Sequence, residues 1–494
     1  MRLWIGLHLH QLPLEAFEPQ WSSDGVSVVL EHEKVLGMSR AARAAGIKHG
    51  MRRGGVLMLV PDARVHERSI ERESAALHAV AMALLKYTPL VTLAEESSLL
   101  VEIGGSLTLF GGIRALCRLI RADLRALGFS GRVSCAPTAR GAWLLARTGS
   151  RRLLKAQTMA RHLDRLLVLA IPAARPFASW FEGIGCETIA DLRRLPRAGL
   201  QRRCGRQLLD TLDSALGSAP ELFEWIEAPT TFEAKIELFD RIENADLLLA
   251  GAQRLILELV GWLCSRQMAV ERVTVFLEHE RGREKRPATA VDVALSEPTW
   301  HSEHIVRLLK EKFGKVELVA PVIGMALDAT HLQPMAPLSQ DLFAEPGGTE
   351  EDQKRVMELL VARLGADRVL QPSPVADYRP EVANAWVSVQ EKLREASVLA
   401  QLPPDLQATT RPAWLLAKPI ALLVRDHRPY YTSPLRMISG PERVEAGWWS
   451  NAASRDYFIA EGQGDHSLYW VYRERLSNAD DDGDRKWFLH GLFG

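Results

Sequence analysis

The order of the apolar segments in residues 1–174 constrains the fold more than any other feature of the sequence. The strand-like segments, which have alternating or continuous apolar residues, are 3–9, 25–33, 97–112 and 132–138. The helix-like segments, which are Ala-rich or amphipathic, are 35–46, 69–89 and 113–129. Strands and helices in this mixed order are typical of an antiparallel sheet with helices on one face. We therefore expect an α+β fold in this part of the chain.

Length and composition set the class of protein. A chain of 494 residues is too long for one ordinary core, so we expect several domains. Hydrophobic residues make up 47% and charged residues 25%, as in soluble globular proteins. No run of 18 apolar residues and no signal peptide are present, so we expect a cytoplasmic protein with no membrane contact.

The cysteines and the net charge exclude two further classes. The chain has five scattered cysteines without a CxxC motif: Cys117, Cys135, Cys186, Cys204 and Cys264. This pattern indicates reduced thiols, and we expect neither a zinc site nor a site for another cofactor. Equal numbers of basic and acidic residues, 61 of each, argue against a protein that is coated by nucleic acid as a whole. Local basic patches remain possible.

The remainder of the chain divides into four segments by composition. Residues 175–230 are helical, 231–333 form a second α/β unit, 334–350 are a Pro- and Gly-rich linker, and 351–494 form a β-rich module with many aromatic residues. Between Thr231 and Asp328 there are 13 Lys and Arg against 16 Asp and Glu. That balance is not the basic one of a tight duplex binder.

Three motifs in register point to a known family. They are the opening strand, "SRAARAAGIKHGM" at 39–51 and "VSCAPTARGAWLLARTG" at 133–149. Together they resemble the palm and fingers of Y-family, or translesion, DNA polymerases. The resemblance implies palm and fingers at 1–174, a helical thumb with a helix-hairpin-helix at 175–230, and a little finger at 231–333.

A second set of motifs narrows the resemblance. It comprises "QLPLEAF", "EIGGSLTLFGG", "RRLPRAGLQRR", and, in the C-terminal part, "SGPERVEAGWW", "RDYF" and "WFLHGLFG". These stretches are similar to a catalytically inactive, polymerase-like branch that belongs to a bacterial mutagenesis cassette. Ordinary lesion-bypass polymerases lack the C-terminal module.

The family's catalytic positions are occupied here by residues that do not suit its chemistry. A polymerase holds two Mg²⁺ ions with carboxylates, and imidazole is a poor substitute. The resemblance places His8 and His10 at the acidic positions of the first strand and Pro13 at the sugar gate. It places Ser97 and Ser98 at the later acidic pair. We therefore expect no polymerase activity and no metal at these degenerate positions.

Another register of the later strand leaves an enzyme possible. A shift of two residues keeps the same side chains on the same face and puts Glu95 and Glu96 at the acidic pair. The alternative to an inactive protein is then a translesion polymerase of low activity that uses these two residues. The Glu102 and Gly-turn positions favour the serine register.

The resemblance and the residues also predict binding sites. For DNA, which we expect to be bound weakly and without sequence preference, the candidates are Arg43, Gly183, Gly185, Arg202, Arg203, Arg206, Arg281, Arg283, Lys285 and Arg286. The family's palm lysine falls near Trp143, whereas Arg43 keeps the position of a triphosphate contact.

A short motif in the linker indicates a protein partner. "LSQDLF" resembles the motif by which bacterial proteins bind the sliding clamp, with Ser339 in the usual Gln position, Gln340, Asp341, and the apolar pair Leu342 and Phe343. The resemblance further implies that the C-terminal module binds a RecA-like accessory protein and the alpha subunit of an error-prone replicative-type polymerase. The implied function is a nucleoid-associated scaffold in damage-induced mutagenesis, part of the SOS response. A damage-recognition module that acts alone is a third possibility.

Overall fold

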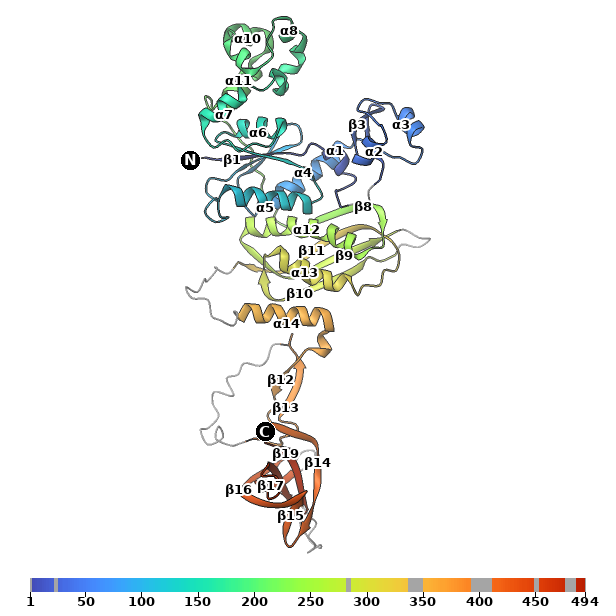
Figure 1. The fold of residues 1–494 in the computed structure, drawn as a ribbon, viewed down its shortest axis with the longest axis vertical. Coiled ribbons are helices and arrows are strands. Elements are labelled where there is room, and N and C mark those ends of the chain that lie inside the picture. The colour runs from blue at the N-terminus through green and yellow to red at the C-terminus, as the bar shows by residue number, and fades with distance from the viewer. Residues whose placement is uncertain are drawn as a thin grey trace. The chain divides into compact units, whose positions relative to one another are not determined.

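The computed structural model describes residues 2–21, 25–280, 286–335, 350–391, 411–447, 453–475 and 486–493. The chain forms two compact units, residues 1–359 and 360–494. The division falls inside one helix, a few residues after the predicted start of the C-terminal module at residue 351. Each unit is described by itself (Figure 1).

The first unit begins with an antiparallel sheet in the order β5-β6-β1-β7. The strands are β1 (Trp4–His8), β5 (Val91–Ala94), β6 (Ser98–Glu102) and β7 (Arg132–Ala136). The helices around it are α1 (Leu12–Glu15), α4 (Ile70–Leu84), α5 (Ile113–Ala126), α6 (Ala139–Thr148) and α7 (Ala156–Leu163). Alternate residues of β1 face two cores: Ile5 and Leu7 pack with α4 and α5, and Trp4 packs with α6. The predicted α+β fold is confirmed, but helices cover both faces of the sheet.

A small unit is inserted between β1 and α4, where the resemblance places the fingers. It consists of the sheet β3-β2-β4 and two short helices. Their bounds are β2 (Ser27–Glu31), β3 (Lys34–Met38), β4 (Arg64–Glu67), α2 (Arg40–Ala44) and α3 (Arg53–Leu59). The helix expected at 35–46 is therefore wrong in its first half. Residues 34–38 pair with β2, and the helix starts only after Ser39, whose side chain accepts from the Ala42 N–H.

The expected thumb is helical. Two 3₁₀ turns, η1 (Val168–Ala170) and η2 (Pro172–Phe177), lead into four helices: α8 (Ala178–Gly183), α9 (Ile189–Arg194), α10 (Arg197–Cys204) and α11 (Arg206–Leu216). A capping box of Thr188 and Asp191 fixes the start of α9. The apolar faces of these helices join the core beneath α6.

The expected little finger is a sheet in the order β10-β9-β11-β8, with two helices on one face. Its elements are β8 (Ala234–Ile242), α12 (Ala245–Arg266), β9 (Met268–His279), β10 (Thr289–Thr299), α13 (Ser302–Phe313) and β11 (Val322–Pro334). Helix α12 also packs on α4: a Cβ on Gly261 would lie 1.9 Å from the Met82 carbonyl oxygen. Only glycine permits this approach.

Helix α12 is the one helix in the described part of the chain that is long and apolar enough to cross a membrane. Of its apolar window, 61% is buried inside the protein. Leu257 of this helix belongs to the core beneath the first sheet. Arg254 and Glu258, one turn apart on the same helix, form an ion pair whose two side chains are largely buried. These contacts are those of a core helix.

Helix α14 (Glu350–Leu364) follows the linker, and its first half is attached to the little finger. The buried Glu358 carboxylate accepts from the Ser296 backbone N–H and pairs with the His304 ring, and Lys354 lies 2.5 Å from Glu297. Residues 336–349 are not among the described residues, but the residues on either side of them both belong to this one unit. Met335 at the other end donates its N–H to the Gln267 carbonyl oxygen.

The second unit contains a hairpin and a closed six-stranded barrel. After η3 (Ala366–Arg368) the hairpin is β12 (Leu370–Pro374) and β13 (Asn384–Ser388). The barrel strands are β14 (Trp414–Arg425), β15 (Arg428–Tyr431), β16 (Ser433–Ala446), β17 (Ala453–Gly462), β18 (Leu468–Glu474) and β19 (Trp487–Leu492), paired in sequence order. The predicted β-rich C-terminal part is confirmed. Tyr457, Trp470 and Tyr472 fill its core, whereas Trp414 is exposed.

Candidate functional site

The pairing of β1 with its neighbours brings together the positions that the resemblance predicts to be degenerate. His8 lies directly opposite Ser98 on β6 and opposite Arg132 on β7. His8 Nδ1 is 3.2 Å from Ser98 Oγ and 3.0 Å from the Glu96 carbonyl oxygen. Because a carbonyl oxygen only accepts, Nδ1 carries the hydrogen of this imidazole. His10 follows at the strand end, with its ring 6.5 Å from that of His8.

The turn between β5 and β6 carries Glu95, Glu96 and Ser97. Glu96 and Ser97 have φ of 54° and 52°, the left-handed conformation of a tight hairpin turn. The Ser97 carbonyl oxygen accepts from the Leu9 N–H at 2.9 Å. The backbone thus holds Ser97 beside β1, but the two glutamates point into a cluster of arginines.

The arginine cluster comes from α6 and η2. Arg147, whose side chain is 8% exposed, forms an ion pair with Glu96, and Arg175 binds the same carboxylate through two nitrogens at 2.7 and 3.2 Å. Arg147 also donates to the Ala170 carbonyl oxygen at 2.6 Å. A carboxylate between two guanidinium groups is neutralised and geometrically fixed. Glu96 therefore connects the palm hairpin to the first turns of the thumb.

Trp143 fills the space behind this turn. Its ring is fully buried, and its Nε1–H donates to the Glu95 carbonyl oxygen at 3.1 Å. The guanidinium carbons of Arg140 and Arg147 lie 5.1 and 4.6 Å from the ring centroid, within the range of cation–π contacts. Arg140 also reaches Glu95 at 3.5 Å. A bulky indole and two cations thus occupy the surroundings of the turn.

Sequence reasoning missed the arginine cluster. Arg140, Trp143 and Arg147 are spaced i, i+3, i+7, so one face of α6 carries all three. That spacing was the available signal. Their partners, Glu95 for Arg140 and Trp143 and Glu96 for Arg147, are about fifty residues away in sequence, and helix spacing does not identify such partners.

Burial and the arginines keep the histidines uncharged. Burial lowers the pKa of His8 to about 4, and the Arg147 guanidinium adds to this effect. Burial also lowers the pKa of His10, assisted by Arg132. The site thus offers neutral imidazoles and a hydroxyl, close to guanidinium groups.

The pKa of His8 predicts a pH dependence of stability. The unfolded imidazole has a pKa of 6.5 and the folded one about 4, so only the unfolded state takes up a proton between these values. The contribution of neutral His8 to stability is therefore present above pH 6.5 and is lost as the pH falls toward 4, by less than about 1.4 kcal/mol per pH unit because the side chain is partly exposed to solvent. Urea titrations from pH 7.5 to 4.5 test this. The His8→Gln variant should show a shallower slope, and an unchanged slope would contradict the assignment. A His490→Gln control accounts for a second histidine whose pKa is lowered by burial to about 4.

The donor set does not fit the Mg²⁺ pair of a polymerase. Mg²⁺ requires hard oxygen ligands, and the guanidinium groups of Arg147 and Arg175 would repel it. The nearest carboxylates, of Glu95 and Glu96, are paired with these arginines. Across the described ranges, no three His, Cys, Asp or Glu side chains are grouped so as to hold a metal ion.

The predicted DNA contacts lie on separate elements. Gly183 is exposed at the end of α8, and Gly185 is exposed between α8 and α9. Arg202 and Arg203 are exposed in the last turn of α10, and Arg43 is exposed on α2. Arg206 opens α11 and lines a pocket of about 600 Å³ beside β5 and β6, together with Arg140 and Asp210. Arg286 is exposed just before β10. Arg281, Arg283 and Lys285 lie outside the described residues.

The open face of the little-finger sheet offers few unpaired cations. Lys235 pairs with Glu278 at 2.9 Å, Arg241 pairs with Glu280, and Arg272 lies 3.7 Å from Asp292. Each cation on this face is thus matched by an acid of a neighbouring strand. A phosphate backbone would have to displace these partners, which weakens binding.

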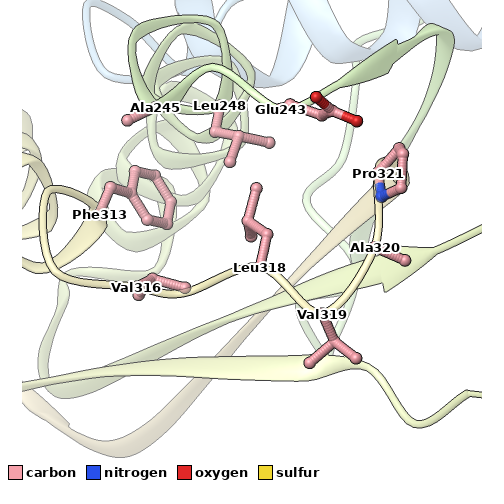
Figure 2. A pocket seen from close by; sticks show the side chains of 9 residues that line it. All are labelled: Glu243, Ala245, Leu248, Phe313, Val316, Leu318, Val319, Ala320 and Pro321. Atoms are coloured by element: carbon pink, nitrogen blue, oxygen red, sulfur yellow. The ribbon is translucent and has the colours of Figure 1, made fainter.

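One predicted segment lies outside the described residues, and one further pocket shares no residue with this site. Ser339, Gln340, Asp341, Leu342 and Phe343 lie outside the described residues. A pocket of about 500 Å³ in the little finger is lined by apolar side chains of α12, α13 and the loop before β11, with Glu243 at its rim (Figure 2). Glu243 is its one titratable side chain, so this pocket lacks the grouped acids or bases that catalysis requires.

Comparisons with known proteins agree with the motifs. Residues 15–147 match the IMS family, described as the impB/mucB/samB family. The chain is 27% identical over 472 residues to Protein ImuB of two strains of Caulobacter vibrioides, NA1000/CB15N and ATCC 19089/CB 15; the match covers 91% of this chain and all of each relative. Among solved structures, an insertion ternary complex of Dbh DNA polymerase is 15% identical with a TM-score of 0.37, covering 67% of this chain and 99% of that one.

Proposed function

Because the chain is an ImuB-like protein with a polymerase-like α+β fold, we propose that it is a non-catalytic scaffold in damage-induced mutagenesis and translesion synthesis. In this proposal it links the sliding clamp to an error-prone replicative-type polymerase alpha subunit and a RecA-like accessory protein, in the cytoplasm at the nucleoid. The observation that supports the proposal is the pairing of His8 with Ser98, two positions at which the resemblance leads us to expect acids in a polymerase.

The electrostatics of the site support the absence of polymerase chemistry. Two-metal catalysis draws on carboxylates to place two cations against the attacking and leaving oxygens. Here the facing groups are an uncharged imidazole and a hydroxyl, and Glu96 is engaged by Arg147 and Arg175. The alternative, a weak polymerase that uses Glu95 and Glu96, would need both carboxylates released from their arginines.

Weak DNA binding is supported by the thumb. The N–H groups of Ile184, Gly185 and Cys186 donate to carbonyl oxygens of α8, so the candidate phosphate contacts are the exposed Arg202 and Arg203, and such contacts carry no sequence information. The paired cations of the little-finger sheet contribute little. The proposal therefore assigns DNA a positioning role.

We expect DNA affinity to depend on salt through the thumb arginines. The Arg202→Gln/Arg203→Gln variant should weaken binding of a labelled duplex and reduce the slope of log affinity against log salt by about 1–2, since each lost phosphate contact removes about 0.9. Fluorescence anisotropy at several salt concentrations measures this. Arg425→Gln/Arg428→Gln in the barrel is the control. An unchanged slope in the thumb variant would place DNA elsewhere.

The clamp motif gives the direct test of the scaffold. Replacing Leu342 and Phe343 by alanine should abolish binding to a purified bacterial sliding clamp, because these side chains fill its apolar cleft. Ser339→Gln, which restores the usual anchor, should tighten binding severalfold. Surface plasmon resonance with the full chain provides both values. Clamp binding that survives the double alanine variant would refute the role of this segment.

A further inference from the structure

The fingers unit exposes three consecutive large apolar side chains. On α3, Met58 is 85% exposed, and Leu57 and Leu59 are also exposed, whereas Val56 alone is buried. Successive helix residues are about 100° apart, so three in a row cannot all face one small core. The side chains that fill that core come from other elements, among them Val28, Leu30 and Val35. An exposed cluster of this kind marks a surface that binds a partner.

The chain near this cluster is rich in cations. Residues 34–64 contain seven Lys or Arg and one Asp. Arg53 and Arg64 pair with glutamates. The other five are exposed, and the described part of the chain gives them no ion pair: Lys34, Arg40, Arg43, Lys48 and Arg52. Arg52 directly precedes α3, and a β-bridge joins it to Lys34. The name fingers surface is used below for Leu57, Met58 and Leu59 with Lys34, Lys48 and Arg52.

A partner of the fingers surface must be both acidic and apolar. Phosphates would satisfy the cations but would leave the three apolar side chains uncovered. Two acidic segments that contain no Lys or Arg lie wholly or mostly outside the described residues. Residues 479–484 contain four Asp but no large apolar residue, whereas residues 336–352 contain five acids, no Lys or Arg, and Leu338, Leu342 and Phe343. Only the second segment complements both properties of the surface.

We propose that the fingers surface binds the acidic, apolar segment 336–352 of this chain, from the same or another copy. The segment would place Leu342 and Phe343 against Met58 and Leu59, with Asp341 and Glu345 near the cations. If the proposed clamp binding of this segment holds, the fingers surface competes with the clamp and covers the motif until the clamp is present.

The test uses a fluorescent peptide of residues 336–352 and the full chain carrying Leu342→Ser/Phe343→Ser, so that its own segment does not compete. Anisotropy should show binding. Adding Met58→Glu/Leu59→Glu should weaken it at least tenfold. These side chains are exposed, so the variant should fold, which circular dichroism checks. Leu109→Glu, at an apolar residue 79% exposed on another loop, should change nothing.

Three results would overturn the proposal: no peptide binding, equal binding by the Met58→Glu/Leu59→Glu variant, or a tenfold loss of oligonucleotide binding in that variant with peptide binding intact. The last would assign the surface to nucleic acid. In an otherwise native chain, Met58→Glu/Leu59→Glu should tighten clamp binding severalfold. A chain that never binds the clamp would refute the proposed function, while the peptide result would stand by itself.

Discussion

The Trp143→Ala variant is expected to lose about 3–5 kcal/mol of unfolding free energy, the largest effect of any single change considered for this protein. The indole is fully buried and makes a hydrogen bond to the Glu95 carbonyl oxygen. Alanine would leave a cavity, an unpaired carbonyl oxygen and two guanidinium groups without their ring. Urea unfolding at pH 7.5 measures the loss.

Two further variants separate the causes. Trp143→Phe keeps most of the volume but lacks the N–H, so it should cost about 1–2 kcal/mol. Trp225→Ala, at a ring that is partly exposed and stacks on Trp4, is a control with a smaller expected loss. Trp143→Lys would introduce the residue type of active polymerases. If that chain is as stable as the native one, Trp143 does not hold the turn.

The Glu96→Ala variant is expected to lose about 2–3 kcal/mol. Removing one partner of a buried ion pair costs about 3–5 kcal/mol because the other charge stays buried, and the partial exposure of Glu96 reduces this. Arg147 would lose its carboxylate, and Arg175 would be released from the hairpin.

Glu95→Ala is the matched control for this change. Glu95 is half exposed, and its carboxylate makes one long contact with Arg140, so we expect a loss below about 1 kcal/mol. Differential scanning calorimetry of both variants beside the native chain gives the comparison. Equal stability of the Glu96→Ala and native proteins would contradict a structural role and would free this carboxylate for another one.

Sequence alone predicted the α+β fold, since the order of apolar segments survives in the sheet β5-β6-β1-β7. It did not predict that helices cover both faces: α6 approaches the second face at Gly6, where an added Cβ would lie 2.4 Å from the Ala142 carbonyl oxygen, and a glycine in a sequence does not name its neighbour. The short strand β3 was missed because the alanines after Ser39 extended an apparent helix backward.

The motifs singled out residues of the candidate site but not the contacts that these residues make. The register with His8 opposite Ser98 brings together two positions that the motifs had singled out. The pairing of Glu96 with Arg147 and Arg175 depends on the turn conformation and on how η2 reaches the palm. Neither follows from spacing along the chain.

Primer extension tests the central claim most directly. The native chain and its Glu95→Ala/Glu96→Ala variant are incubated with undamaged and lesion-bearing templates, with Mg²⁺ or Mn²⁺, beside an active translesion polymerase as a control. The account predicts no nucleotide incorporation by either protein. Incorporation by the native chain that disappears in the double variant would contradict it and would make the protein an enzyme.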